Sequence, residues 1–379
     1  MTMGPGAKVW ERFGHNAIWV RDAASGTSIA YNYGLFSFTQ ESFFLRFAQG
    51  RMRYAMGGFP AERYFRLYER ADRAVHVQEL DLTPAEAAAV RDFLRWNDVP
   101  GRREYRYDYY RDNCSTRVRD VLDRALGGRL RRALEPVPTG DSYRSWTRRL
   151  TRPDLPLYVG LDLLLGQPTD APISAWEAAF VPMELERRVR DLAVTRADGT
   201  TRPLVRREYI LHETRRHPEP MAPPRWFPQF LAAGLLLGAG FAALGVAARD
   251  GRRWAALALA GAGGTWAAVT GLGGLVLAGF WALTDHAVAY RNENVLQLDV
   301  LGLALALLVA PAVLRGAHLG RARLLALVVA AASAAGVGLK LLPAFSQANS
   351  EILALTVPAH AGLALALALL ARGPLRRNP

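Results

Sequence analysis

Hydrophobic and polar positions divide the chain of 379 residues into two halves of different character. Residues 1 to about 215 alternate between short aromatic-rich segments with strand periodicity and arginine-rich segments with helical periodicity. Five long apolar runs follow, at about 227–248, 254–283, 295–314, 322–342 and 351–371. Most of these runs have about the 20 residues that a helix needs to cross a bilayer. The pattern therefore predicts an α+β domain followed by an all-α membrane domain of five helices.

Proline marks the boundary between the two predicted domains. The stretch HPEPMAPPRWFP, residues 217–228, contains five prolines, which is typical of a stiff linker. We therefore expect a globular domain over residues 1–215, a proline-rich linker over 216–228 and a transmembrane domain over 229–379.

The loops between the apolar runs differ in charge, and this difference predicts an orientation. Arginines follow the first, third and fifth runs, at positions 249, 252, 253, 315, 321, 323, 372, 376 and 377. The other two loops, 284–294 and 343–351, carry three acidic residues and one arginine. The positive-inside rule then places the C-terminus in the cytoplasm and residues 1–215 outside it. An exported domain needs a signal, and MTMGPGAKVW does not read as one, so we expect either that the chain starts further upstream or that the signal segment was removed.

The net charge of +13 changes this picture only slightly. The basic residues are scattered and include no nucleic-acid-binding motif, so we expect no nucleic-acid partner and take a lipid bilayer as the better one. The sequence has no HExxH or CxxC motif and one cysteine, so it predicts neither a metal site nor a cofactor.

The single cysteine lies in YDYYRDNCSTRVRDVLDRALGG, residues 107–128. Apolar residues after it recur with helical spacing, and Asp112 or Asn113 is suited to cap that helix. Cys114 is therefore expected on the first helical turn, where unpaired N–H groups and the helix dipole stabilise a thiolate. The alternative is a small buried cysteine of the core.

A nucleophilic thiol needs a base, and histidine is the usual one. Five of the seven histidines are less suitable, because they lie in an alternating strand, near the linker, in a cytoplasmic loop or inside the last span: His76, His212, His217, His318 and His360. This leaves His15 and His286 as candidates.

A predicted hairpin gives His15 a specific environment. Pairing Arg21 with Ser28 across the turn DAASGT puts His15 opposite Gly34, with Asn32 on the same face. Glycine leaves room for a ligand, and Asn32 is placed to fix the tautomer of the imidazole ring. The alternative is a structural histidine stacked within an aromatic strand.

A second polar cluster lies between two apolar runs. Asp285, His286, Asn292 and Asn294 are candidates for substrate contacts at the outer mouth of the helical bundle. The alternative is that they terminate two helices.

Several of these motifs together resemble one bacterial family. The segments FGHNAIWV, YNYGLFSF, F-x-x-x-F-A-Q-G-R-M-R-Y and YDYYRDNCSTRVRD occur in the order found in lipoprotein N-acyltransferases with an N-terminal periplasmic cysteine domain. The resemblance continues through residues 160–185 and into TDHAVAYRNENVLQLD, residues 284–299. It implies an α+β papain-like fold of the NlpC type, permuted so that histidine precedes cysteine. It also implies a protein of the bacterial inner membrane whose N-terminal domain is periplasmic.

The resemblance further implies an enzyme that forms an acyl-thioester. In this interpretation His15 is the base, Cys114 the nucleophile, a phospholipid the acyl donor and the α-amine of a diacylglyceryl-cysteine lipoprotein the acceptor. We expect backbone N–H groups at the helix start to stabilise the oxyanion, with Asn113, Tyr109 and Ser115 at the site wall. Two alternatives stay open: a Cys–His hydrolase of phospholipid or cell-wall amide bonds, and a membrane scaffold whose thiol is incidental.

Overall fold

The computed structural model describes residues 1–196, 198–216 and 222–371, which form two compact units. The first unit comprises Met1–Tyr158 and the described residues from Ala171 to Pro223. The second comprises Val159–Asp170 and the described residues from Pro224 onward. This division differs from the expected one because residues 159–170 group with the helical part. The predicted linker over 216–228 lies partly outside the described residues.

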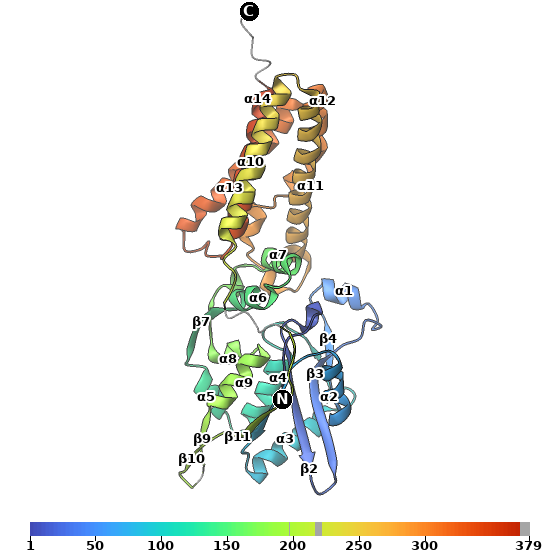
Figure 1. Cartoon of the computed structure of the whole chain (residues 1–379), viewed down its shortest axis with the longest axis vertical. Helices are drawn as coiled ribbons and strands as arrows, with labels where there is room; N and C mark the ends of the chain where they lie inside the picture. Colours follow the sequence, from blue (N-terminus) through green and yellow to red (C-terminus); the bar gives the residue numbers. More distant parts are fainter. Residues whose placement is uncertain (197, 217–221, 372–379) are drawn as a thin grey trace, which may run out of the picture. The chain divides into compact units, whose positions relative to one another are not determined.

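The first unit is built on a seven-stranded antiparallel sheet in the order β11-β5-β1-β2-β3-β4-β6 (Figure 1). Its strands are β1 (Thr2–Met3), β2 (His15–Asp22), β3 (Thr27–Leu35), β4 (Arg53–Pro60), β5 (Val75–Leu80), β6 (Glu104–Arg106) and β11 (Val205–His212). Two small ribbons pair β7 (Pro138–Ser142) with β8 (Pro172–Ser174) and β9 (Ala193–Thr195) with β10 (Thr201–Pro203).

Short helices surround this sheet. They are α1 (Phe43–Ala48), α2 (Ala61–Arg70), α3 (Pro84–Asn97), α4 (Cys114–Ala125), α5 (Arg129–Leu134), α6 (Tyr143–Thr151), α8 (Ala175–Ala178) and α9 (Pro182–Asp191), with the 3-10 turn η1 (Val9–Glu11). The predicted α/β character of this part is confirmed. The finer papain-like, NlpC-type assignment stays a prediction.

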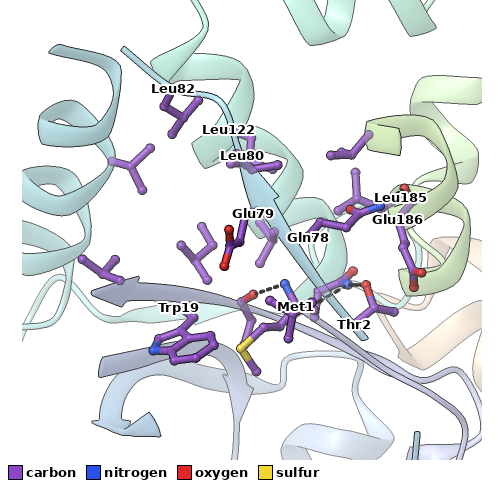
Figure 2. A pocket seen from close by; sticks show the side chains of 18 of the residues that line it. Met1, Thr2, Trp19, Gln78, Glu79, Leu80, Leu82, Leu122, Leu185 and Glu186 are labelled. Atoms are coloured by element: carbon purple, nitrogen blue, oxygen red, sulfur yellow. Dashed lines mark hydrogen bonds between the residues drawn. The ribbon is translucent and has the colours of Figure 1, made fainter. Parts of the chain in front are cut away.

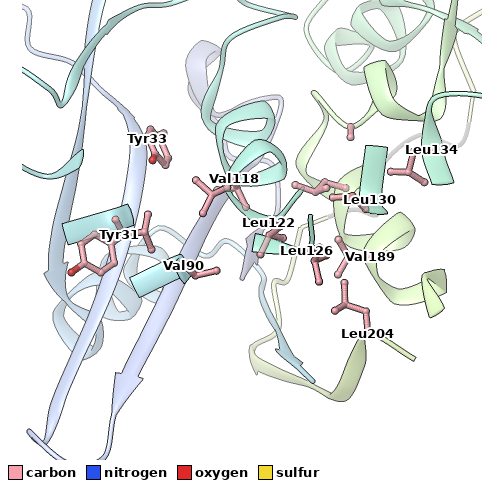
Figure 3. Close-up of a cluster of buried hydrophobic side chains, with 14 of the residues drawn as sticks. Tyr31, Tyr33, Val90, Val118, Leu122, Leu126, Leu130, Leu134, Val189 and Leu204 are labelled. Carbon is pink, nitrogen blue, oxygen red and sulfur yellow. The ribbon is translucent and has the colours of Figure 1, made fainter. Parts of the chain in front are cut away.

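Side chains alternate along β3, so the two faces of the sheet belong to two separate buried cores. Tyr31 belongs to a buried cluster with Val118 and Leu122 of α4, which Figure 3 shows together with residues of α3, α5 and α9. Ala30 belongs to a second buried cluster, with Ala61 and Tyr64 of α2. The sheet therefore lies between α4 on one face and α2 on the other.

The second unit contains five helices that are long and apolar enough to cross a membrane, as the sequence predicts. Their helical segments are α10 (Phe227–Arg249), α11 (Arg253–Leu283), α12 (Leu301–Arg315), α13 (Leu319–Gly338) and α14 (Ser350–Leu370). Shorter elements of the unit are η2 (Gln167–Thr169), η3 (Ala287–Ala289), η4 (Glu293–Leu296) and η5 (Leu339–Leu341). The helix α7 (Leu155–Leu164) begins in the first unit and ends in the second.

Glycine allows α10 and α14 to approach closely. A Cβ atom on Gly238 would lie 2.3 Å from the carbonyl oxygen of Pro358, and one on Gly362 would lie 2.2 Å from that of Gly238. Small residues at such crossings let helix backbones contact each other directly, which drives association where no hydrophobic effect operates.

Candidate active site

The hairpin of β2 and β3 has the predicted register. Arg21 pairs with Ser28, and the ladder continues to Ala17 opposite Asn32. Two residues further along β2, the His15 Nε2 atom lies 3.3 Å from the Asn32 Oδ1 atom. The diagonal relationship expected from the sequence is therefore present, and it rests on the alternation of side chains along paired strands.

Asn32 fixes the tautomer of His15. Its side chain is fully buried, and its Nδ2 atom donates to the carbonyl oxygen of Ala30 at 3.1 Å. This bond orients the amide so that Oδ1 faces the imidazole, and an amide oxygen can only accept. His15 must then carry its proton on Nε2, which leaves the Nδ1 lone pair available as a base.

Gly34 shapes the end of the hairpin where the strands separate. Its φ of +90° is a conformation that favours glycine, and the register of β3 with β4 shifts between Tyr33 and Leu35. A Cβ atom on Gly34 would lie 3.5 Å from the Cβ atom of Cys114. The nucleophile candidate therefore lies directly beside the glycine that the sequence places opposite His15.

Cys114 is the first residue of α4, and Asn113 is its N-cap. The Asn113 Oδ1 atom accepts from the N–H groups of Ser115 and Thr116, each at 2.9 Å. Its Nδ2 atom donates to the carbonyl oxygens of Tyr109 and Phe180, each at 3.0 Å. Of the two residues predicted as caps, Asn113 is the one used, and it ties the helix start to two other segments.

The thiol of Cys114 is half-buried and accepts hydrogen bonds from the backbone N–H groups of Asn16 and Ser115. These donors favour the thiolate, as the sequence predicts for a first helical turn. Burial nevertheless outweighs them and raises the pKa of Cys114 to about 11. The expectation of a stabilised thiolate is therefore wrong for the resting site, because desolvation of the charge exceeds the contribution of the donors.

The same effect acts on His15 with the opposite sign. Burial and, to a lesser extent, the positive charge of Arg73 lower the pKa of the imidazole to about 4, although the hydrogen bond to Asn32 acts in the opposite direction. Near neutral pH the resting site thus holds a protonated thiol and a neutral imidazole. A neutral imidazole can accept a proton, whereas an imidazolium cannot.

The three side chains predicted at the site wall are engaged within the protein. Asn113 caps α4, as described. The Ser115 hydroxyl lies 2.7 Å from Asn16 Oδ1 and 2.6 Å from the carbonyl oxygen of Ala179. The Tyr109 hydroxyl donates to Met52 Sδ at 3.4 Å. Asn113 also occupies the N–H groups of Ser115 and Thr116, whereas the backbone N–H groups of Cys114 and Asn16 face the sulfur atom.

Two residues near His15 could not be predicted from the sequence pattern. The ring of Tyr68 in α2 stacks on His15 with the centroids 6.3 Å apart. The guanidinium of Arg73 lies 4.8 Å from the Tyr68 ring, and its Nε atom donates to the carbonyl oxygen of Gly4 at 2.8 Å. A third neighbour, Asn16, directly follows His15 in the FGHNA segment, and that adjacency is the one signal that could have found it.

The second polar cluster is located in the helical unit. The Asn292 Nδ2 atom donates to the carbonyl oxygens of Leu163 and Leu164 at 2.7 and 3.1 Å, and Asn294 Nδ2 donates to that of Leu163 at 3.2 Å. Both asparagines therefore bind the end of α7. His286 is buried, and its ring lies 5.2 Å from that of Phe280. The predicted substrate contacts of Asp285, His286, Asn292 and Asn294 stay a prediction.

A cavity of about 440 Å³ opens in the first unit between β2 and β5, because β1 separates these strands over only two residues (Figure 2). Trp19, Glu79 and Leu122 are among its lining residues. Asn16 lines it as well, whereas His15 and Cys114 are not among its lining residues.

The fold and the site together define a membrane protein whose α/β domain brings a histidine and a cysteine to the same end of one hairpin. Residues 1–149 match the family model described as the Lnb N-terminal periplasmic domain, so this part of the chain belongs to that domain family. With the five candidate membrane helices that follow, the chain fits an Lnb-type lipoprotein N-acyltransferase of the inner membrane. Searches of curated proteins and of solved structures found no match.

Proposed function

We propose that this protein transfers a fatty acyl chain from a lipid ester, through a thioester on Cys114, to the N-terminal amine of a diacylglyceryl-cysteine lipoprotein. The acyl donor in this proposal is a phospholipid. The observation that carries the proposal is the hydrogen bond between His15 and Asn32, which leaves an unprotonated ring nitrogen at the end of the hairpin where Cys114 lies. The match to the Lnb periplasmic domain supports a role in lipoprotein processing.

The first half-reaction follows from the protonation states of the pair. His15 Nδ1 takes the proton of the Cys114 thiol as the sulfur attacks the ester carbonyl. We expect the backbone N–H groups of Cys114 and Asn16, which face the sulfur atom, to stabilise the oxyanion. When the tetrahedral intermediate collapses, the imidazolium returns its proton to the departing alkoxide. A lysolipid leaves, and the acyl chain stays on the sulfur as a thioester.

The second half-reaction reverses these roles. The acceptor amine attacks the thioester carbonyl, His15 takes a proton from the nitrogen, and the thiolate leaves and is reprotonated. The products are an amide and the original thiol. Transfer to an amine in preference to hydrolysis requires that water be excluded while the thioester exists.

Intact mass spectrometry of the full chain with phospholipid tests this proposal. Wild type should gain the mass of one fatty acyl group, hydroxylamine should remove it, and Cys114→Ala should gain nothing. A diacylated lipopeptide added next should receive an amide-linked acyl chain. The same lipopeptide without phospholipid is the control for the donor, because its own esters are acyl sources too.

The outcomes separate the rival functions. Cys114-dependent release of free fatty acid, with no adduct and no amide, would make the protein a lipid hydrolase. Equal behaviour of wild type and Cys114→Ala, with folding verified, would leave a cell-wall hydrolase or a scaffold. Amide formation without phospholipid would be consistent with the thioester chemistry but would mean that the acyl donor is the lipopeptide itself and not a phospholipid.

A further inference from the structure

The first unit exposes a group of aromatic rings that the mechanism does not use. We call it the aromatic patch, and it consists of the exposed Trp10, Phe38, Phe44 and Phe47 around the half-buried Phe36 and the buried Phe43. Neighbouring rings contact each other with centroids 5.1–6.4 Å apart, as in an ordered apolar cluster. The patch lies on η1, on the loop after β3 and on α1, which projects from the body of the unit (Figure 1).

The exposure of the patch is unusual for its composition. Phe44 is 73% exposed, Trp10 54% and Phe38 52%. Leu45, next to Phe44 in the sequence, is 58% exposed as well. Soluble surfaces rarely display contiguous apolar groups of this kind, and those that do use them as interaction sites.

The composition around the patch, rather than its net charge, points to the occupant. The Lys8 ammonium lies 5.6 Å from the Trp10 ring, and Arg46 is in the last turn of α1 among the exposed phenylalanines. The acidic side chains in the same segments are Glu11 and Glu41. Exposed aromatic rings flanked by Lys and Arg are the composition that proteins use at the interface of a bilayer with anionic lipids. A bilayer is also the surface that the five candidate spans of this chain require.

A row of stacked rings leads from the patch to the buried cluster against which Cys114 packs. Phe36 stacks on Tyr54 with the centroids 5.1 Å apart, and Tyr54 stacks on Tyr107 at 4.2 Å. Tyr107 and Cys114 both pack against the buried cluster that contains Val118 and Leu122. Phe36 is also only two residues from Gly34, which lies beside Cys114.

We infer that the aromatic patch inserts into the lipid bilayer and that the row Phe36–Tyr54–Tyr107 guides an acyl chain from the bilayer to Cys114. The insertion is independent of the reaction, whereas the guidance rests on the function proposed above. The faces of aromatic rings are suited to a fatty chain because they offer a large apolar contact area.

Insertion is tested with one probe on the full chain. Cys114 is the only cysteine, so Cys114→Ala with Phe44→Cys accepts a single NBD label. The protein is reconstituted into phosphatidylcholine–phosphatidylglycerol vesicles with or without doxyl-labelled lipid. The matched control is Leu67→Cys on α2, which is 56% exposed but lies outside the patch. We expect doxyl lipid to quench the label at position 44 at least about twofold more than at position 67.

Two other occupants would overturn the insertion. Equal quenching at the two positions, with a blue-shifted label at position 44, would mean that protein covers the patch. If the blue shift disappears when the ratio of protein to lipid is lowered, that protein is a second copy; if it persists, it is another part of the same chain. Equal quenching without a blue shift would mean that the patch faces water.

Guidance is tested by a substitution that leaves the catalytic pair intact. Phe36→Asp should slow acylation of Cys114 by vesicle phospholipid about tenfold, since it removes the first ring of the row and adds a charge to the path of the acyl chain. Acylation by water-soluble p-nitrophenyl butyrate should stay as in wild type, and Leu67→Asp should match wild type with both donors. Equal losses with both donors would overturn guidance. Absence of any thioester in wild type would refute the proposed function while the quenching result still decides the insertion.

Discussion

The Nε2 atom of His15 lies 3.3 Å from the Oδ1 atom of Asn32, and this contact sets the tautomer of the ring. In Asn32→Ala the proton is free to move to Nδ1, and the base is lost in that fraction of molecules. We expect the rate of thioester formation to fall by about 10- to 100-fold. Stopped-flow or quenched-flow mass spectrometry with a saturating donor measures this rate, and an unchanged rate would show that Asn32 is only structural.

A carboxylate at the same position should act in the opposite sense on the protonation of the pair. In Asn32→Asp a negative charge next to His15 favours the imidazolium, so it raises the pKa of the ring above its present value of about 4. The imidazolium in turn stabilises the thiolate. We expect faster alkylation of Cys114 by iodoacetamide at pH 7 than in wild type, with Asn32→Ala as the neutral comparison.

The pH dependence of alkylation reports the resting state of the thiol directly. Because the thiolate is the nucleophile and burial raises the pKa of Cys114 to about 11, the rate in wild type should still be rising between about pH 8 and 10. A lowered pKa would give a plateau by about pH 8. Such a plateau would contradict the neutral pair and favour a preformed thiolate–imidazolium.

Gly34 and Gly26 form a matched pair of positions. Both have positive φ, +90° and +67°, but a Cβ atom on Gly26 meets nothing within 4 Å, whereas one on Gly34 meets Cys114. Alanine at either position should destabilise the fold by about 1–2 kcal/mol. Only Gly34→Ala should also reduce thioester formation, by roughly 10-fold or more, because it crowds the reacting sulfur. Thermal unfolding and acylation rates of the two variants separate the effects.

Removal of the cap of α4 should cost more than removal of an exposed cap. Asn113→Ala leaves two helical N–H groups and two carbonyl oxygens without their partners, so we expect a loss of about 2–3 kcal/mol. The control is Thr83→Ala at the exposed cap of α3, where Thr83 accepts from Glu86 N, with an expected loss of about 1 kcal/mol. Equal losses would show that the buried bonds of Asn113 add little.

The sequence predicts those parts of the structure that depend on local patterns. The hairpin register follows from the alternation around DAASGT, and the first turn of α4 follows from Asn113 and the spacing of Val118 and Leu122. The five candidate spans follow from length and hydropathy alone.

Other features depend on contacts between distant segments, which local patterns do not encode. Nothing in the sequence indicates that Tyr68 stacks on His15 or that the Arg73 guanidinium lies over the Tyr68 ring. The grouping of residues 159–170 with the helical unit rests on hydrogen bonds from Asn292 and Asn294, more than 120 positions away. The pKa of Cys114 was predicted in the wrong direction because the helix start is visible in the sequence and the burial is not.

The half-buried position of the Cys114 thiol affects its resistance to oxidation as well as its rate of acylation. Peroxides attack thiolates far faster than thiols, and sulfinic and sulfonic acids are dead ends for a nucleophile. A cysteine that stays protonated until an ester binds therefore reacts slowly with oxidants while no substrate is bound. The same desolvation that raises the pKa of Cys114 thus protects the only sulfhydryl on which the proposed chemistry depends.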